Sequence, residues 1–197
     1  VSPLRYVQSR RRDFSGQLAD EISQAAFDLA HEQTGALIVM ARNDNPSEYL
    51  HSGQEINAIP VPALIKSIFN RRGPAHDGAV LIIGGRLTQM GCILPLSERQ
   101  DIPPQFGTRH RAVFGITEVT DAVCLVVSEE RSEVTTIVNG HYDVWREPEL
   151  LAVRLKQLLG MPERIGRRSR NFFLSFLKIK KGSTSIWVGS GCLFCRC

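Results

Sequence analysis

Two short segments of this sequence place ionisable side chains at the start of a regular element. The first is His76-Asp77-Gly78, which directly precedes the apolar run 79–83. The second is 108–111, Thr-Arg-His-Arg, at the start of an expected helix. Carboxylate oxygens are preferred ligands of hard divalent cations, and an arginine fork holds two phosphate oxygens at once. These residue types therefore predict phosphate chemistry assisted by a divalent cation.

The second segment carries the wrong sign of charge for its place. A helix N-terminus is already positive and favours acids, yet Arg109 and Arg111 stand there. Thr108 is the expected cap, and free backbone N–H groups would join the two guanidiniums around an anion. His110 either hydrogen-bonds the same anion or packs inside the helix. The simpler alternatives are an ordinary turn at 76–78 and a solvated basic turn at 108–111.

Further carboxylates stand beside a second expected strand. Glu129 and Glu130 follow the strand 122–127, whereas Asp77 precedes another strand. Ligands of open α/β sheets usually bind at strand ends, so these groups are candidates for holding the cation. The sequence contains neither a G-x-x-x-x-G-K-S/T loop nor a G-x-G-x-x-G motif. A bound nucleotide would therefore be held by another device.

The elements that must position these groups follow from apolar periodicity and turn residues. A long helix begins with Asp13 as its N-cap and ends near Gly35, and glycine-containing turns at 84–85 and 139–140 predict two hairpins. The expected strands are 36–41, 80–83, 86–94, 122–127, 134–138 and 142–145, and the other expected helices are 61–70, 108–118 and 148–159. The pattern predicts a mixed α/β fold, with a central twisted parallel and antiparallel sheet flanked by helices on both faces.

The distribution of charge separates a domain from a tail. Residues 161–197 hold eight Lys or Arg against one acid (+7), and residues 1–160 hold sixteen against nineteen (−3). We therefore expect one folded domain over 1–160 and a basic tail of uncertain structure over 161–197. Nucleic-acid binding through the domain is not expected, since any affinity for polyanions would belong to the tail.

Cysteine usage and hydropathy indicate the cytoplasm. Cys92 and Cys124 lie in apolar stretches, as small buried residues do in a reducing compartment. The terminal group Cys192, Cys195 and Cys197 lacks a second ligand pair for zinc. No run of about 18 apolar residues and no signal peptide is present. Membrane association through the basic, partly apolar tail, or through a segment preceding Val1, is the open alternative.

Taken together, the motifs resemble those of the diadenylate cyclase domain family over about residues 14–159. The matching residues are His76-Asp77-Gly78-Ala79, Leu94-Pro95-Leu96-Ser97, Gly107 to Ala112, Gly115, Glu118, Asp121-Ala122 and Ser128-Glu129-Glu130. Three features depart from the family pattern. Thr117 and Thr120 stand where many relatives carry Ser, Ile93 stands where some carry an aromatic residue, and 131–133 lacks the usual glycine.

The resemblance implies synthesis of cyclic di-AMP from two ATP molecules, with release of two pyrophosphates. It implies Asp77 as the catalytic residue and Mg²⁺ or Mn²⁺ as the cofactor. The implied ATP-binding residues are Gly78, Ala79, Leu94, Thr108, Arg109, His110, Arg111 and Ser128, and the implied metal ligands are His76, Asp77, Glu129 and Glu130. It also implies a homodimer with facing active sites, with a higher oligomer left open. The alternative is an inactive sensor that binds ATP or cyclic di-AMP in the same pocket.

Overall fold

A computed structural model describes residues 16–160 of the chain. The N-cap expected at Asp13 and the basic tail 161–197 lie outside the described residues, so the domain boundary at residue 160 stays a prediction. Within 16–160, no helix has both the length and the apolar character needed to cross a bilayer.

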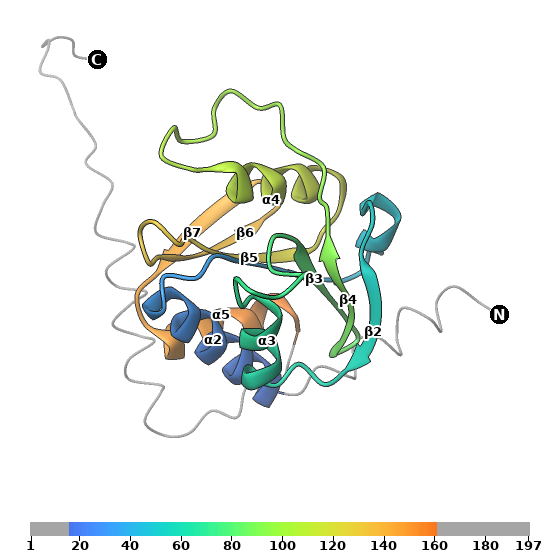
Figure 1. The fold of residues 1–197 in the computed structure, drawn as a ribbon. Coiled ribbons are helices and arrows are strands. Elements are labelled where there is room, and N and C mark those ends of the chain that lie inside the picture. Colours follow the sequence, from blue (N-terminus) through green and yellow to red (C-terminus); the bar gives the residue numbers. More distant parts are fainter. Residues whose placement is uncertain (1–15, 161–197) are drawn as a thin grey trace, which may run out of the picture. The chain divides into compact units, whose positions relative to one another are not determined.

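A seven-stranded sheet forms the middle of the domain (Figure 1). Its strands are β1 (Ala36–Met40), β2 (Gln54–Ala58), β3 (Ala79–Ile83), β4 (Arg86–Cys92), β5 (Val123–Val127), β6 (Val134–Val138) and β7 (His141–Trp145). Their order is β2-β4-β3-β1-β5-β6-β7, with β1 parallel to β3 and the other neighbouring pairs antiparallel. The mixed sheet expected from the hairpins is thus confirmed.

Helices cover both faces of the sheet. In Figure 1, α2 (Gly16–His31), α3 (Pro62–Ile68) and α5 (Pro148–Leu158) lie on one face, and α4 (Thr108–Val119) lies on the other. A short 3-10 helix, η1 (Pro46–Tyr49), follows β1. The central strand β1 is buried along its whole length, as its continuous apolar run predicts. Ile38 packs into the core beneath α2, whereas Val39 packs into the core beneath α4.

Two details differ from the expectations. Strand β2 was not predicted, because its sequence Gln-Glu-Ile-Asn-Ala is largely polar; it forms an exposed edge strand that pairs with β4 alone. Thr108 is the first residue of α4 and not its cap. Gly107 holds the N-cap position with extended backbone, and its carbonyl accepts the N–H groups of His110 and Arg111.

Asp121 ties the connection after α4 to the connection after β1. Its carboxylate accepts hydrogen bonds from the backbone N–H groups of Asn43 and Asp44, at 3.1 Å and 3.0 Å, and from the Asn43 side chain. Its own N–H donates to the Asp44 carboxylate at 2.9 Å. These hydrogen bonds fix together two loops that are far apart in the sequence and that adjoin the neighbouring strands β1 and β5.

Replacing Asp121 by Ala should lower the free energy of unfolding by about 1–3 kcal/mol, because two backbone donors lose a charged acceptor. Urea denaturation would measure the change. Asp143→Ala is the matched control, since Asp143 makes a half-exposed ion pair of 3.9 Å with Arg154 and should cost less than about 1 kcal/mol. Equal losses in the two variants would contradict this structural role of Asp121.

Candidate active site

The pairing of the central strands gathers four chain segments where these strands begin or end, along one side of the sheet that is called its edge below. β1 and β3 run parallel, so the turn before β1 and Asp77 before β3 lie at the same edge. β4 and β5 run the opposite way, with Cys92 opposite Ala79 and Val127 opposite Ala36. The site therefore collects the amino ends of the parallel pair and the carboxyl ends of their antiparallel neighbours. The usual rule for parallel sheets, which places ligands at carboxyl ends alone, does not describe this mixed sheet.

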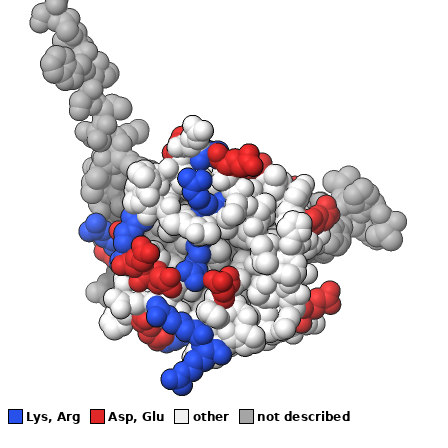
Figure 2. All heavy atoms as spheres, turned by 45° about the horizontal axis from the view of Figure 1, so that its top comes forward, with Lys and Arg blue, Asp and Glu red and all other residues white. Residues whose placement is uncertain are grey.

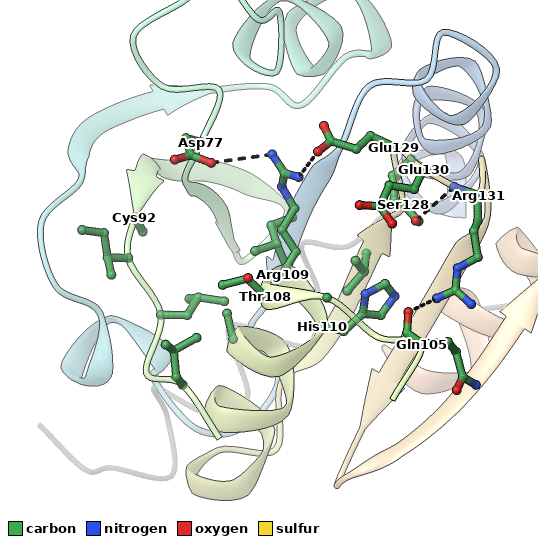
Figure 3. A pocket seen from close by; sticks show the side chains of 18 residues that line it. Asp77, Cys92, Gln105, Thr108, Arg109, His110, Ser128, Glu129, Glu130 and Arg131 are labelled. Carbon is green, nitrogen blue, oxygen red and sulfur yellow. Dashed lines mark hydrogen bonds and ion pairs between the residues drawn. The ribbon is translucent and has the colours of Figure 1, made fainter. Parts of the chain in front are cut away.

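A cavity of about 660 Å³ opens at this edge, beside the N-terminus of α4 (Figure 3). Cavities of this size accommodate small-molecule ligands. Its lining includes eight of the residues expected in the site: Asp77, Leu94, Thr108, Arg109, His110, Ser128, Glu129 and Glu130. Four others do not line it: His76, Gly78, Ala79 and Arg111.

Arg109 lies between two carboxylates that come from opposite sides of the cavity (Figure 3). Its guanidinium is 3.6 Å from an oxygen of Asp77 and 3.2 Å from an oxygen of Glu129. The side chain of Arg109 is 28% exposed, whereas that of Asp77 is 87% exposed. Arg109 is thus held within the wall of the cavity, while Asp77 stands at its rim.

A second arginine approaches Glu129 from outside the cavity lining. Arg71 lies 3.8 Å from the Glu129 carboxylate and donates a hydrogen bond of 2.7 Å to the carbonyl oxygen of Gln33. Figure 2 shows acidic and basic side chains mixed on the face turned forward, without one continuous basic patch. Attraction for an anion on this face is therefore a local property of individual guanidiniums.

Arg111 points away from the cavity, although it belongs to the same helical turn as Arg109. Successive helical residues are rotated by about 100°, so two residues that are two positions apart face nearly opposite directions. Arg111 is accordingly exposed outside the cavity lining. Thr108 is exposed and lines the cavity. Of the two guanidiniums expected to converge, only that of Arg109 lines this cavity, and a phosphate contact by Arg111 stays a prediction.

His110 is buried and packs against an aromatic ring. Its imidazole stacks on Phe106, with ring centroids 4.2 Å apart and the planes nearly parallel. Burial, together with the nearby charge of Arg131, lowers the pKa of His110 to about 4. Of the two roles considered for His110, packing is the one seen; the imidazole is neutral near pH 7 and still borders the cavity.

The residues at the mouth of β3 set the path of the backbone. His76 donates from Nδ1 to the carbonyl oxygen of Gly73 at 2.7 Å, since a carbonyl can only accept. A Cβ atom at position 78 would lie 2.4 Å from the Cα of Gly91 on β4, so only glycine fits there. Ala79 is fully buried. These contacts make a tight turn that presents Asp77 to the cavity.

Sequence reasoning missed Arg131 as a cavity residue. Its guanidinium donates a 2.6 Å hydrogen bond to the carbonyl oxygen of Gln105 (Figure 3). The same group lies over the ring of Phe106. It thereby joins the β5–β6 turn to the loop before α4. The available signal was the basic residue after Glu130, where the family pattern is interrupted.

The cavity carries hard oxygen donors suited to a divalent cation. Asp77, Glu129 and Glu130 all line it, whereas no group of three or more His, Cys, Asp or Glu in a metal-binding arrangement occurs among residues 16–160. Mg²⁺ is commonly bound through one or two carboxylates together with substrate phosphates. The carboxylates present fit that mode and not a cage made by protein ligands alone.

Comparison with known proteins identifies the family. A family model described as "DisA bacterial checkpoint controller nucleotide-binding" (DAC) matches residues 23–142. Diadenylate cyclase CdaS of Bacillus thuringiensis is 40% identical over 135 residues, 68% of this chain and 67% of the relative. Cyclic di-AMP synthase CdaA of Bacillus subtilis is 38% identical over 140 residues, 71% of this chain and 50% of the relative. The matched part thus spans between half and two thirds of these proteins.

Solved structures share this fold. A double mutant of DacA from Staphylococcus aureus superposes with a TM-score of 0.69 at 31% identity, covering 73% of this chain and 95% of that one. A protein described as a hypothetical membrane spanning protein from Bacillus cereus gives a TM-score of 0.65 at 34% identity, covering 72% and 69%. The resemblance inferred from the motifs is confirmed, and the chain belongs to the DAC family of diadenylate cyclases.

Proposed function

We propose that this chain condenses two ATP molecules into cyclic di-AMP and releases two pyrophosphates, at a site formed between two facing protomers. The observation that carries the proposal is the convergence of Asp77 and Arg109 on one cavity from different elements. A carboxylate beside a guanidinium at a helix N-terminus provides both a group for a ribose hydroxyl and a group for phosphates.

Each ATP would lie along the cavity with its phosphates at the start of α4. Arg109, the hydroxyl of Thr108 and the free N–H groups of the first helical turn would hold the phosphates. Leu94, together with the exposed Ile93 and Leu96, offers an apolar wall for adenine. Ser128 on the opposite side would meet the nucleotide, and Gly78 and Ala79 would shape the backbone beside it.

The reaction forms a bond between the ribose O3′ of one ATP and the α-phosphorus of the other. The bond from that phosphorus to the bridging oxygen breaks, pyrophosphate leaves, and Asp77 orients the hydroxyl and accepts its proton. A second such step, in which the O3′ of the other ribose attacks the α-phosphorus of the first nucleotide and releases the second pyrophosphate, closes the ring. Members of the family generally depend on a metal ion. Mg²⁺ or Mn²⁺ held by Asp77, Glu129 and Glu130 would neutralise phosphate charge.

Two facing protomers follow from this chemistry, because each ribose must reach the α-phosphorus of a nucleotide held elsewhere. An isologous twofold dimer presents the same cavity from both sides. The high exposure of Asp77 at the cavity rim supports this arrangement, since the carboxylate is open to a nucleotide carried by a second copy.

One observation favours the alternative of a sensor that binds nucleotide without turnover. Asp77 and Glu129 are both paired with Arg109, so the carboxylates needed for a cation are engaged by a protein side chain. In a cyclase, binding of ATP and metal would have to release them. Turnover therefore separates the two functions where nucleotide binding does not.

Purified protein incubated with ATP and Mg²⁺ or Mn²⁺ should produce cyclic di-AMP, identified by mass spectrometry together with pyrophosphate. The specific activity should rise with protein concentration up to a plateau, because the active species is a dimer. Analytical ultracentrifugation over the same range would supply the dimer fraction. Nucleotide binding without cyclic product, at concentrations where the dimer dominates, would establish the sensor and reject the cyclase.

Asp77→Asn should reduce turnover by at least about 100-fold, because the amide keeps the shape but cannot accept the hydroxyl proton. Binding of α,β-methylene ATP, which cannot release pyrophosphate, should stay within a few-fold of wild type. Asp143→Asn is the matched control, since that half-exposed carboxylate lies on β7 away from the cavity. Wild-type turnover in Asp77→Asn would remove Asp77 from the mechanism.

His110 should make the fold less stable in mild acid, because its folded pKa lies near 4 and an unfolded histidine titrates near 6.5. Between these values the unfolded state binds a proton that the folded state does not. His110 therefore leaves the free energy of unfolding unchanged above about pH 6.5 and lowers it as the pH drops towards 4. The total loss is up to about 3 kcal/mol. Urea unfolding of wild type and His110→Phe from pH 7 to 5 should show a flatter dependence in the variant. Parallel curves would disprove a buried neutral His110.

A further inference from the structure

The connection between α2 and β1 runs directly beneath the guanidinium of Arg109. It consists of residues 32–35 and ends at Gly35, which is buried. Gly35 does not have a positive φ, so its backbone conformation is open to any residue. Any requirement for glycine at this position would therefore come from what a side chain would touch.

A side chain at position 35 would collide with Arg109. A Cβ atom built there would lie 2.7 Å from Nη1, 2.8 Å from Cζ and 3.2 Å from Nε of that arginine. All three of these nearest atoms belong to the guanidinium group, so the plane of the guanidinium lies against the glycine. The contact joins residues that are 74 positions apart in the sequence.

Arg109 is confined on its other sides by the carboxylates already described. Asp77 lies 3.6 Å from one nitrogen and Glu129 lies 3.2 Å from another. The connection below is itself anchored, because the carbonyl oxygen of Gln33 accepts the 2.7 Å hydrogen bond from Arg71. Gly35 thus forms a fixed floor, and the carboxylates hold the guanidinium against it.

We infer that Gly35 is a positioning residue for the phosphate-binding arginine, acting only through Arg109. The inference rests on the proposed function for its consequence in catalysis, but the contact itself predicts a change in nucleotide binding. The colliding atoms are the far end of a flexible side chain. An added methyl group should therefore displace the guanidinium from its carboxylates and from the phosphate position, while the fold stays intact.

Gly35→Ala should weaken binding of α,β-methylene ATP by about 10-fold or more, because a small misplacement of a bidentate group removes most of its benefit. The KM for ATP should rise by a similar factor. The melting temperature should stay close to that of wild type. Thr34→Ala is the matched control: it alters the same connection, adds no atom towards Arg109, and should bind like wild type.

A double-mutant cycle tests whether Gly35 acts through Arg109 alone. Arg109→Met should itself weaken nucleotide binding, and adding Gly35→Ala to it should cause no further loss. Wild-type affinity in Gly35→Ala would overturn the inference, and so would an equal additional loss in the Arg109→Met background. If Gly35→Ala unfolds the protein, Gly35→Ala with Arg109→Met should restore folding; failure in both backgrounds would show that Gly35 serves the backbone and not the arginine.

These outcomes are separable from the fate of the proposed function. Loss of nucleotide binding in Gly35→Ala, with no cyclic product from the wild type, would reject the cyclase while retaining the role of Gly35. Turnover by the wild type with unchanged binding and KM in Gly35→Ala would retain the cyclase and reject the role of Gly35.

Discussion

The placement of one guanidinium organises this site. Arg109 comes from the N-terminus of α4, and it meets Asp77 before β3, Glu129 after β5 and the backbone before β1. A charged group that is largely withdrawn from water needs such partners, because burying an unpaired charge is costly. In the proposed reaction, the same partners would have to release Arg109 when a triphosphate binds. We therefore expect phosphate binding to Arg109 and cation binding to the carboxylates to be coupled, since each releases the group that the other requires.

Sheet topology explains why the coupled groups are neighbours. Because β4 and β5 run antiparallel to the central pair β1 and β3, the amino ends of β3 and β1 lie between the carboxyl ends of β4 and β5 along one edge. A wholly parallel sheet would place Asp77 and Glu129 at opposite edges. The hairpins that interrupt the alternation of strands and helices are therefore a requirement of the site as well as a feature of the fold.

Local chemistry predicted much of this arrangement, whereas contacts between distant segments escaped it. The mixed sheet followed from apolar runs and glycine turns, and the loci around Asp77 and Arg109 followed from residue types at element starts. The direction of Arg111 could have been obtained from helical geometry alone, since residues two apart face opposite sides. The contact of Gly35 with Arg109 and that of Arg131 with Gln105 depend on tertiary packing, for which the spacing in the chain offers no signal.

The contrast in exposure between Asp77 and Arg109 fits a reaction shared by two nucleotides. A group that holds its own ligand benefits from confinement, since preorganisation removes an entropic cost of binding. A group that must meet a ligand carried by another copy has to remain accessible until that copy arrives. Arg109 has the first environment and Asp77 has the second. Because the two side chains form an ion pair, the confined Arg109 keeps the exposed carboxylate of Asp77 in place. The position of Asp77 at the cavity rim therefore depends on how firmly Arg109 is held in the cavity wall.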